Sequence, residues 1–249
     1  MTSTSPAQLS EEAETFSKFL KVASSRIPRV TPAANTSLLL ASSAGGVYAG
    51  VGAPPYAEES AVVAASAYGE TKLAMERALT EFVTDTGCRA VIARISNLYG
   101  PDQRIEKPQG LVSQLCKSLL RRRPISIYVS LDTMRDYIYS DDAAMIAEAC
   151  LARIETSEFA GLTIVKNVAS HEPTTLGHLL HEARLVFKRK PTVILASSPL
   201  AAGQVVDLRV ESTTWPEMND LPRRSLMVGM SQVKASMELQ MQTRGLEFT

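Results

Sequence analysis

The stretch Leu38-Leu39-Leu40-Ala41-Ser42-Ser43-Ala44-Gly45-Gly46-Val47-Tyr48 decides the fold of this chain, because an apolar run breaks there into small hydroxyl and glycine residues. Residues 38–41 are too few for a buried helix and predict a short buried strand. Serine and glycine are turn residues, so a turn is predicted at the carboxyl end of that strand. The stretch therefore predicts a strand that carries Ser42 and Ser43 to its end.

Tyr68 and Lys72 follow this turn and lie four residues apart, so they share one face of a helix. A lysine ammonium beside a tyrosine hydroxyl favours the phenolate, which then accepts a proton near neutral pH. Ser43 precedes Tyr68 by 25 positions and is placed to hold a substrate alcohol. These residues suit proton transfer coupled to hydride transfer to a nicotinamide, whereas the four-residue spacing alone also fits an ordinary exposed helix.

Strands and helices alternate along the chain, which predicts a doubly wound parallel α/β sheet. The predicted elements are a helix at 8–24, a loop at 25–36, a helix at 67–83 with Ser66 as its N-cap, and buried strands at 89–95 and 162–168. Asp141 and Asp142 are expected to cap a helix at 143–151.

The 249 residues carry 26 basic and 26 acidic side chains, and this balance argues against a general binder of nucleic acid or of membrane surfaces. No apolar run reaches the roughly 18 residues that span a bilayer. Cys88, Cys116 and Cys150 are isolated, which predicts a reduced, cytoplasmic protein without disulfides. His178 and His181 have no evident third ligand, so no metal site is expected.

The one basic run, Arg121-Arg122-Arg123, ends an apolar helical stretch at 111–120 and precedes Pro124. Cations at a helix C-terminus interact favourably with the helix dipole. A solvated helix end is therefore preferred over a phosphate site.

Two further motifs follow in order: Val91-Ile92-Ala93-Arg94-Ile95-Ser96-Asn97-Leu98-Tyr99-Gly100-Pro101 and Arg135-Asp136-Tyr137-Ile138-Tyr139-Ser140-Asp141-Asp142. Together with the serine turn and the Tyr68–Lys72 pair, they resemble the extended short-chain dehydrogenase/reductase superfamily. The match is to its NAD-dependent epimerase/dehydratase family of nucleotide-sugar enzymes, over most of residues 36–170. The resemblance implies a Rossmann-like sheet, a small C-terminal substrate lobe and a nucleotide-sugar substrate. It also implies NAD as cofactor, or NADP, since the residues that decide between them are not in this sequence.

The resemblance implies roles for eight positions. The expected catalytic residues are Ser43, Tyr68 and Lys72. The expected cofactor contacts are Ser42, Tyr68, Lys72, Ile95 and Ser96, and the expected substrate contacts are Ser43, Asn97 and Arg135. Two of these positions keep a second interpretation: Asn97 also fits a strand-ending turn, and Arg135 also fits an ion pair with Asp136 or Asp142.

This sequence departs from the family pattern at three points. Ala44 stands where many members carry the catalytic hydroxyl, so the neighbouring Ser43 is assigned that role. Gly45 and Gly46 replace the acid pair of the dehydratases, which disfavours 4,6-dehydration relative to epimerisation or simple redox chemistry. The sequence also contains no Gly-x-x-Gly-x-x-Gly turn, so the N-terminal βαβ half is expected to be missing, through an internal start or a truncated gene.

We therefore expect residues 1–100 to form a partial dinucleotide-binding domain. Residues 101–249 would supply the substrate lobe, with 136–188 returning to the sheet. The expected function is that of a nucleotide-sugar epimerase-type oxidoreductase, active as a possible homodimer. Two alternatives stay open: a truncated, non-catalytic sugar-nucleotide binder or partner subunit, and a reductase of non-sugar carbonyls.

Overall fold

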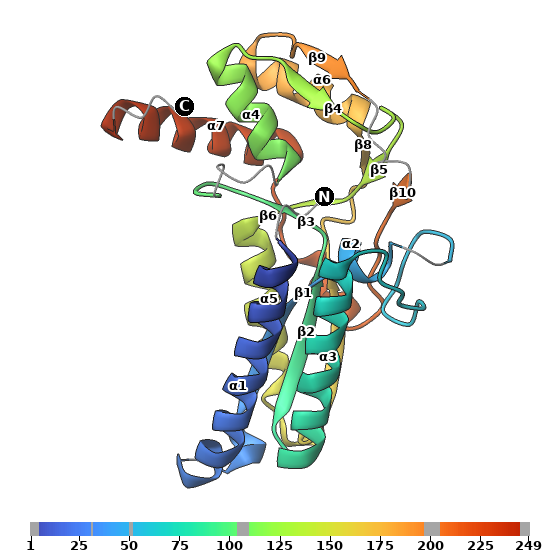
Figure 1. Cartoon of the computed structure of the whole chain (residues 1–249), viewed down its shortest axis with the longest axis vertical. Helices are drawn as coiled ribbons and strands as arrows, with labels where there is room; N and C mark the ends of the chain where they lie inside the picture. Colours follow the sequence, from blue (N-terminus) through green and yellow to red (C-terminus); the bar gives the residue numbers. More distant parts are fainter. Residues whose placement is uncertain (1–4, 31, 50–51, 104–109, 197–204, 245–249) are drawn as a thin grey trace.

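A computed structural model of the chain describes residues 5–30, 32–49, 52–103, 110–196 and 205–244. Its helices are α1 (Pro6–Val30), α2 (Ala44–Val47), α3 (Ala67–Thr86), α4 (Leu111–Arg121), α5 (Ser140–Ile154), α6 (Leu176–Phe187) and α7 (Leu226–Arg244). Its strands are β1 (Ser37–Ser43), β2 (Arg89–Ile95), β3 (Asn97–Tyr99), β4 (Ile125–Ile127), β5 (Met134–Arg135), β6 (Tyr137–Tyr139), β7 (Thr163–Val168), β8 (Thr174–Thr175), β9 (Val193–Leu195) and β10 (Asp207–Leu208). Figure 1 shows two units stacked along the long axis of the molecule.

The lower unit is built on a parallel sheet in the order β1-β2-β7. Successive residues of a strand point to opposite faces, and both faces of this sheet are apolar. Ala90 and Ile92 pack into the cluster on one face, and Val91 and Ala93 into the cluster on the other. A parallel sheet that is apolar on both faces must be covered by helices on both sides.

Helices α1 and α3 lie side by side over one face of this sheet, and α5 covers the other (Figure 1). This arrangement confirms the predicted doubly wound α/β fold. The strand at 89–95 is confirmed at both ends, and Ser66 does cap α3, accepting a hydrogen bond from the Gly69 amide. Gly87 ends α3 in the left-handed conformation, at φ 75°.

Helix α1 is longer than predicted and runs through the first half of the expected loop at 25–36. Its apolar stripe explains the difference, because Phe16, Leu20, Ala23 and Ile27 all pack into the cluster that α1 shares with α3. Tertiary packing thus extends the helix past its polar residues.

Helix α5 also begins earlier than predicted, at Ser140, and Tyr139 occupies the N-cap without a side-chain bond. The prediction that Asp141 and Asp142 cap a helix starting at Ala143 is therefore wrong. Both aspartates lie in the first helical turn, and Asp142 instead accepts hydrogen bonds from the backbone amide and guanidinium of Arg224.

The upper unit packs α4, α6 and α7 around one hydrophobic cluster, with the parallel pair β4·β9 beside it. Within residues 136–188, β7 joins the β1-β2-β7 sheet, α5 packs on that sheet, β6 pairs with β3, and α6 joins α4 and α7. The two units are joined by a small third sheet in the order β10-β5-β8 and by the β3·β6 pair. Among the described residues, no helix combines the length and apolarity that crossing a bilayer requires.

Candidate active site

Ser43 is the last residue of β1 and the N-cap of α2, where its hydroxyl accepts a hydrogen bond from the Gly46 amide at 3.2 Å. A Cβ on Gly46 would lie 3.2 Å from Cε1 of Tyr68 and 3.4 Å from Cβ of Ser43. The serine and tyrosine side chains therefore flank the same point on α2. The side chains of Ser43 and Tyr68, both predicted to be catalytic, thus lie on either side of Gly46.

The start of α3 lies against α2 because position 69 is a glycine. A Cβ on Gly69 would overlap the carbonyl oxygen of Gly46, so only glycine permits this approach. The contact places the first turn of α3, with Tyr68, beside the serine turn. Gly46, expected in the serine turn, and Gly69, expected in the helix at 67–83, thus set the spacing of the site.

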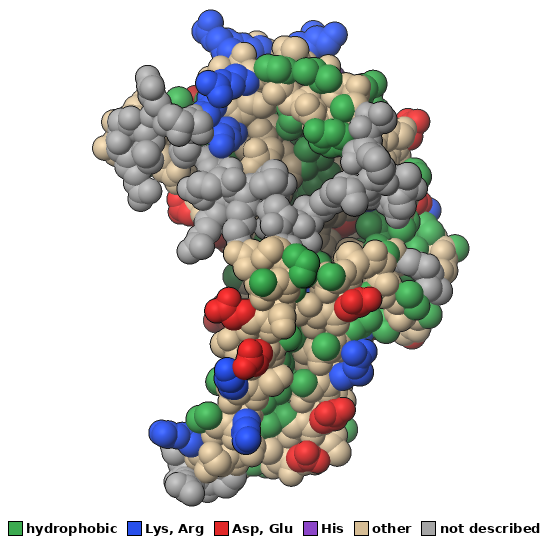
Figure 2. All heavy atoms as spheres, viewed as in Figure 1, with side chains coloured by type: hydrophobic (Ala, Val, Ile, Leu, Met, Phe, Trp, Pro, Cys, Tyr) green, Lys and Arg blue, Asp and Glu red, His purple; other side chains and the backbone are tan. Residues whose placement is uncertain are grey.

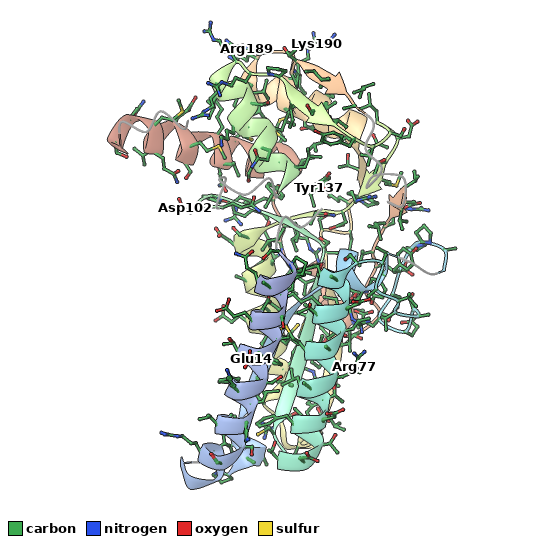
Figure 3. The ribbon with its side chains drawn as sticks, in the orientation of Figure 1. Glu14, Arg77, Asp102, Tyr137, Arg189 and Lys190 are labelled. Carbon is green, nitrogen blue, oxygen red and sulfur yellow. The ribbon has the colours of Figure 1, made fainter. Side chains whose placement is uncertain are left out.

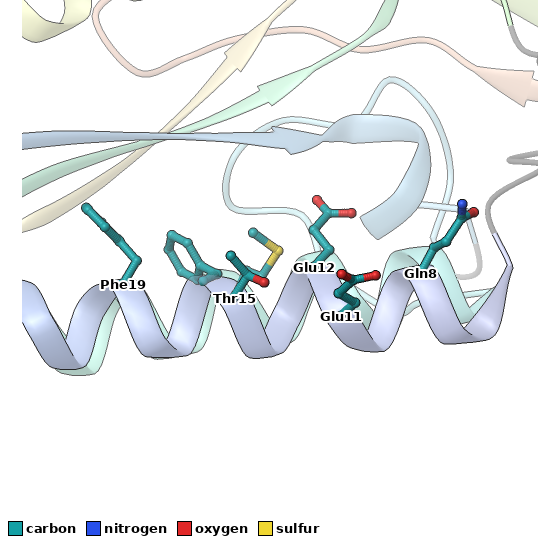
Figure 4. A pocket seen from close by; sticks show the side chains of 7 residues that line it. Gln8, Glu11, Glu12, Thr15 and Phe19 are labelled. Atoms are coloured by element: carbon teal, nitrogen blue, oxygen red, sulfur yellow. The ribbon is translucent and has the colours of Figure 1, made fainter.

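Lys72 lies one turn after Tyr68 and is 9% exposed. Its Nζ is 5.6 Å from the centroid of the Tyr68 ring, and it donates a hydrogen bond to Oε1 of Glu12 at 2.7 Å. Glu12 belongs to α1 and lines, with Glu11 and Phe19, a groove of about 490 Å³ along that helix (Figure 4). No local pattern in the sequence indicates Glu12, because its partner is 60 residues away.

A buried ion pair lies behind these three residues. Arg94 of β2 donates from Nη2 to Oε2 of Glu76 at 2.7 Å and from Nη1 to the Tyr48 hydroxyl at 3.0 Å. Burial alone would lower the pKa of the Arg94 guanidinium, but the bonds and charge of Glu76 outweigh it and raise that pKa. Burial raises the pKa of the Tyr48 phenol, although Arg94 opposes it. Both groups therefore keep their ordinary protonation states.

Ser42 is the member of the serine pair that faces this ion pair. Its hydroxyl is buried and donates to Oε1 of Glu76 at 2.5 Å. Consecutive strand residues point to opposite sides, which leaves Ser43 on the side of Gly46 and Tyr68. The predicted contact between Ser42 and the cofactor stays a prediction.

The carboxyl end of β2 lies next to that of β1, since Ser43 is the register partner of Ile95. Ile95 is half-buried and packs against the α5 cluster. The next two residues bind Asp136: the Ser96 hydroxyl donates to Oδ1 at 2.6 Å, and the Asn97 side-chain amide donates to the backbone oxygen at 2.7 Å. Ser96 and Asn97 are thus fixed together at the end of the sheet.

Arg135 donates to backbone oxygens rather than to a carboxylate, with bonds of 2.7 Å to Met134 and Val205 and 3.2 Å to Val206. The alternative ion pair with Asp136 or Asp142 is therefore not formed. Burial lowers the pKa of Arg135. Its predicted contact with a diphosphate stays a prediction.

The described residues contain no group of three or more His, Cys, Asp or Glu side chains that could hold a metal ion. His178 is exposed on α6 and its Nε2 lies 3.4 Å from Glu182. The side chains that meet at this site supply a phenol, a hydroxyl and an ammonium.

The sequence that forms this site matches one known protein family. The model of the family described as the NAD dependent epimerase/dehydratase family matches residues 4–161, which include helices α1 to α5 and strands β1 to β6. The chain belongs to this family. The family assignment made from the motifs is confirmed.

Curated members of the epimerase/dehydratase family are similar to parts of the chain. The dTDP-4-dehydro-6-deoxyglucose reductase of Escherichia coli is 30% identical over 175 residues, which cover 69% of this chain and 53% of that protein. The dTDP-L-rhamnose 4-epimerase of Burkholderia thailandensis is 34% identical over 89 residues, 35% of this chain and 24% of that protein. The chain thus spans about half the length of the first relative and less of the second.

Solved structures of epimerases share the fold of the chain. UDP-glucose 4-epimerase of Thermotoga maritima, with UDP-glucose, superposes with a TM-score of 0.77 at 20% identity, over 97% of this chain and 76% of that one. UDP-glucuronic acid 4-epimerase of Bacillus cereus, in complex with UDP-glucuronic acid and NAD, superposes with a TM-score of 0.74 at 19% identity. The match covers 90% of this chain and 66% of that one. The Rossmann-like fold is thereby confirmed.

Proposed function

We propose that this chain carries the proton-transfer half of a nucleotide-sugar epimerase-type oxidoreductase. The observation that carries the proposal is the convergence of Ser43 and Tyr68 on Gly46, with Lys72 beside the tyrosine ring. Tyr68 forms no hydrogen bond with any other described residue, so its hydroxyl is available to a substrate. The site lies at the carboxyl ends of β1 and β2, where open α/β sheets bind their ligands.

In the proposed reaction, Tyr68 takes the proton from a sugar hydroxyl as a hydride leaves the same carbon. Ser43 holds that hydroxyl toward the phenol, and the Lys72 ammonium lies beside the phenol ring. A bound nicotinamide supplies the hydride acceptor. For epimerisation, the proton returns from Tyr68 when the keto sugar is reduced on its other face.

The described residues fit the nicotinamide side of a dinucleotide and not its pyrophosphate side. Lys72 offers an ammonium to ribose hydroxyls, and Ile95 and Ser96 stand at the strand end next to Ser43. Pyrophosphate is held by a glycine turn at a helix N-terminus, and this sequence has no such turn. We propose NAD as the cofactor, in keeping with the family and with its structural relatives.

The substrate proposed is a dTDP- or UDP-linked hexose, since the similar proteins named above act on or bind such compounds. Reduction of a 4-keto sugar is the second candidate reaction. It is favoured by the extent of the match to the Escherichia coli reductase. Both reactions need the same Tyr68 proton transfer, and they differ in whether the hydride returns to the sugar within one turnover.

The proposal is tested by incubating the chain with NAD⁺ or NADH and dTDP- and UDP-hexoses or their 4-keto forms. Products are followed by NMR and by absorbance at the NADH band. Tyr68→Phe should lower turnover by about 10²- to 10⁴-fold, the usual contribution of a positioned general acid–base. Tyr128→Phe removes a phenol from an exposed position outside the site and should leave turnover unchanged. Equal loss in both variants, or none in Tyr68→Phe, would refute the assignment.

We also propose a homodimer that forms through α1 and α3 and works in a reducing compartment such as the cytoplasm. Phe19 and Val22 are half exposed on α1 beside the groove of Figure 4. The three cysteines are buried and unpaired. Light scattering should show a dimer that Phe19→Glu dissociates, and a monomeric unmodified chain would contradict the pairing.

A further inference from the structure

Folding gathers the basic residues of two separate turns at one end of the molecule. We call this set the tip patch: Arg122, Arg123, Lys188, Arg189 and Lys190. Helices α4 and α6 each end at a residue in the left-handed conformation and then lead into β4 and β9. Ile125 and Val193 are register partners in that parallel pair, so the two turns before them emerge side by side.

No described acidic side chain forms an ion pair with the cations of the tip patch. All five side chains are exposed. Residues 110–130 and 183–196 contain no Asp or Glu. The net charge of zero is the sum over the whole chain. Five positive charges from two separate turns nevertheless lie next to one another in the folded structure.

The tip patch lies at an end of the long axis, where Figure 3 labels Arg189 and Lys190. Figure 2 shows Lys and Arg side chains projecting from the upper outline of the molecule over α4 and β9, with hydrophobic side chains between them. Leu185, less than one turn before Lys188, is 47% exposed, and Ile194 of β9 is 49% exposed. Cations that project from a tip and flank exposed aliphatic side chains suit a broad, flat anionic surface.

We propose that the tip patch docks this protein on an anionic phospholipid bilayer surface. The long side chains carry diffuse charge that attracts a charged leaflet without specific geometry. The aliphatic side chains among them can enter the headgroup region, as in other peripheral contacts. The binding is peripheral and requires no membrane-spanning helix, and the Ser43–Tyr68–Lys72 site lies in the other unit. The proposal is therefore independent of the proposed function.

The test is flotation of the full 249-residue chain with vesicles of phosphatidylcholine, with and without 30% phosphatidylglycerol, in low salt. Arg123→Gln, Arg189→Gln and Lys190→Gln are combined in one variant, which leaves the two helix-ending residues untouched. The matched control combines Lys21→Gln, Arg26→Gln and Arg77→Gln, three exposed cations of α1 and α3 whose removal lowers the net charge equally. Circular dichroism checks that both variants are folded.

We expect binding to the phosphatidylglycerol vesicles only, and its loss as salt is raised. Each cation near a charged leaflet contributes about a fivefold change in affinity, so the tip variant should bind about a hundredfold more weakly. The control variant should bind like the unmodified chain. Three results would overturn the proposal: no difference between the two vesicle types, equal loss in both variants, or binding to poly-glutamate or duplex DNA but not to vesicles.

Discussion

Lys72 lies between two groups that attract its ammonium. The Tyr68 ring is one, and the carboxylate of Glu12, within hydrogen-bond distance, is the other. An acid that pairs with the lysine reduces the positive charge that the tyrosine experiences. Glu12 is therefore a positioning residue that holds Lys72 in place and also moderates its effect.

Glu12→Gln keeps an acceptor for the Lys72 ammonium and removes the opposing charge. We expect turnover to rise severalfold, because the Lys72 charge beside the Tyr68 ring then acts without an opposing carboxylate. Glu14→Gln is the matched control, since Glu14 lies half a turn away and pairs with the exposed Lys18. Unchanged or lower turnover in Glu12→Gln would show that Glu12 only anchors the helix.

At the scale of elements, the site depends on how closely α3 approaches α2. Gly69 permits the approach because a methyl group there would overlap the backbone of Gly46. Backbone cannot move aside as a flexible side chain can, so the cost falls on the position of Tyr68. The stability of this contact and the geometry of the site are consequently linked.

Gly69→Ala should destabilise the chain by about 1–3 kcal/mol, the usual cost of overpacking, and should also reduce turnover. Gly45→Ala is the control, since a Cβ there would meet no atom within 4 Å. Urea unfolding and the epimerase assay measure the two effects. Wild-type stability in Gly69→Ala would mean that α2 and α3 are less closely coupled than described.

Much of the element pattern follows from local sequence. The strand at 89–95 is predicted correctly because a continuous apolar run is a local property, and the start of α3 because Ser66 is a good N-cap. The proximity of Tyr68 and Lys72 is predictable for a similar reason, since the two residues share a helical face. The partners of these residues are not predictable: Glu12 meets Lys72, and Glu76 meets Arg94 and Ser42, only after folding brings distant segments together.

At the scale of the whole molecule, Glu58 binds the segment around Ser212 and Thr213, which returns from the upper unit, to β7 of the lower sheet. Its carboxylate accepts hydrogen bonds from the Asn167 and Thr213 amides, each at 2.8 Å, and from the Ser212 hydroxyl. Burial alone would raise the pKa of Glu58, but these hydrogen bonds outweigh it and hold that pKa below its usual value. These hydrogen bonds therefore favour the charged carboxylate of Glu58.

A lowered folded-state pKa gives stability that is present above the unfolded value of about 4.3 and is lost as pH falls through the folded value. Glu58→Gln should accordingly lower Tm at pH 7 and have a smaller effect at pH 3, where the native carboxylate also becomes protonated. Glu148→Gln, exposed on α5, should change Tm little at either pH. A Tm difference for Glu58→Gln that persists undiminished at pH 3 would contradict this role.

Calorimetric titration of NADH into the folded chain tests the central claim most directly, because the proposed chemistry requires the nicotinamide to bind beside Lys72. The account predicts saturable binding of about −5 to −8 kcal/mol, a Kd from micromolar to sub-millimolar, that weakens at least tenfold in Lys72→Met. No binding by a chain shown to be folded, or equal binding by Lys72→Met, would contradict the assignment of Ser43, Tyr68 and Lys72 as a nicotinamide-dependent site.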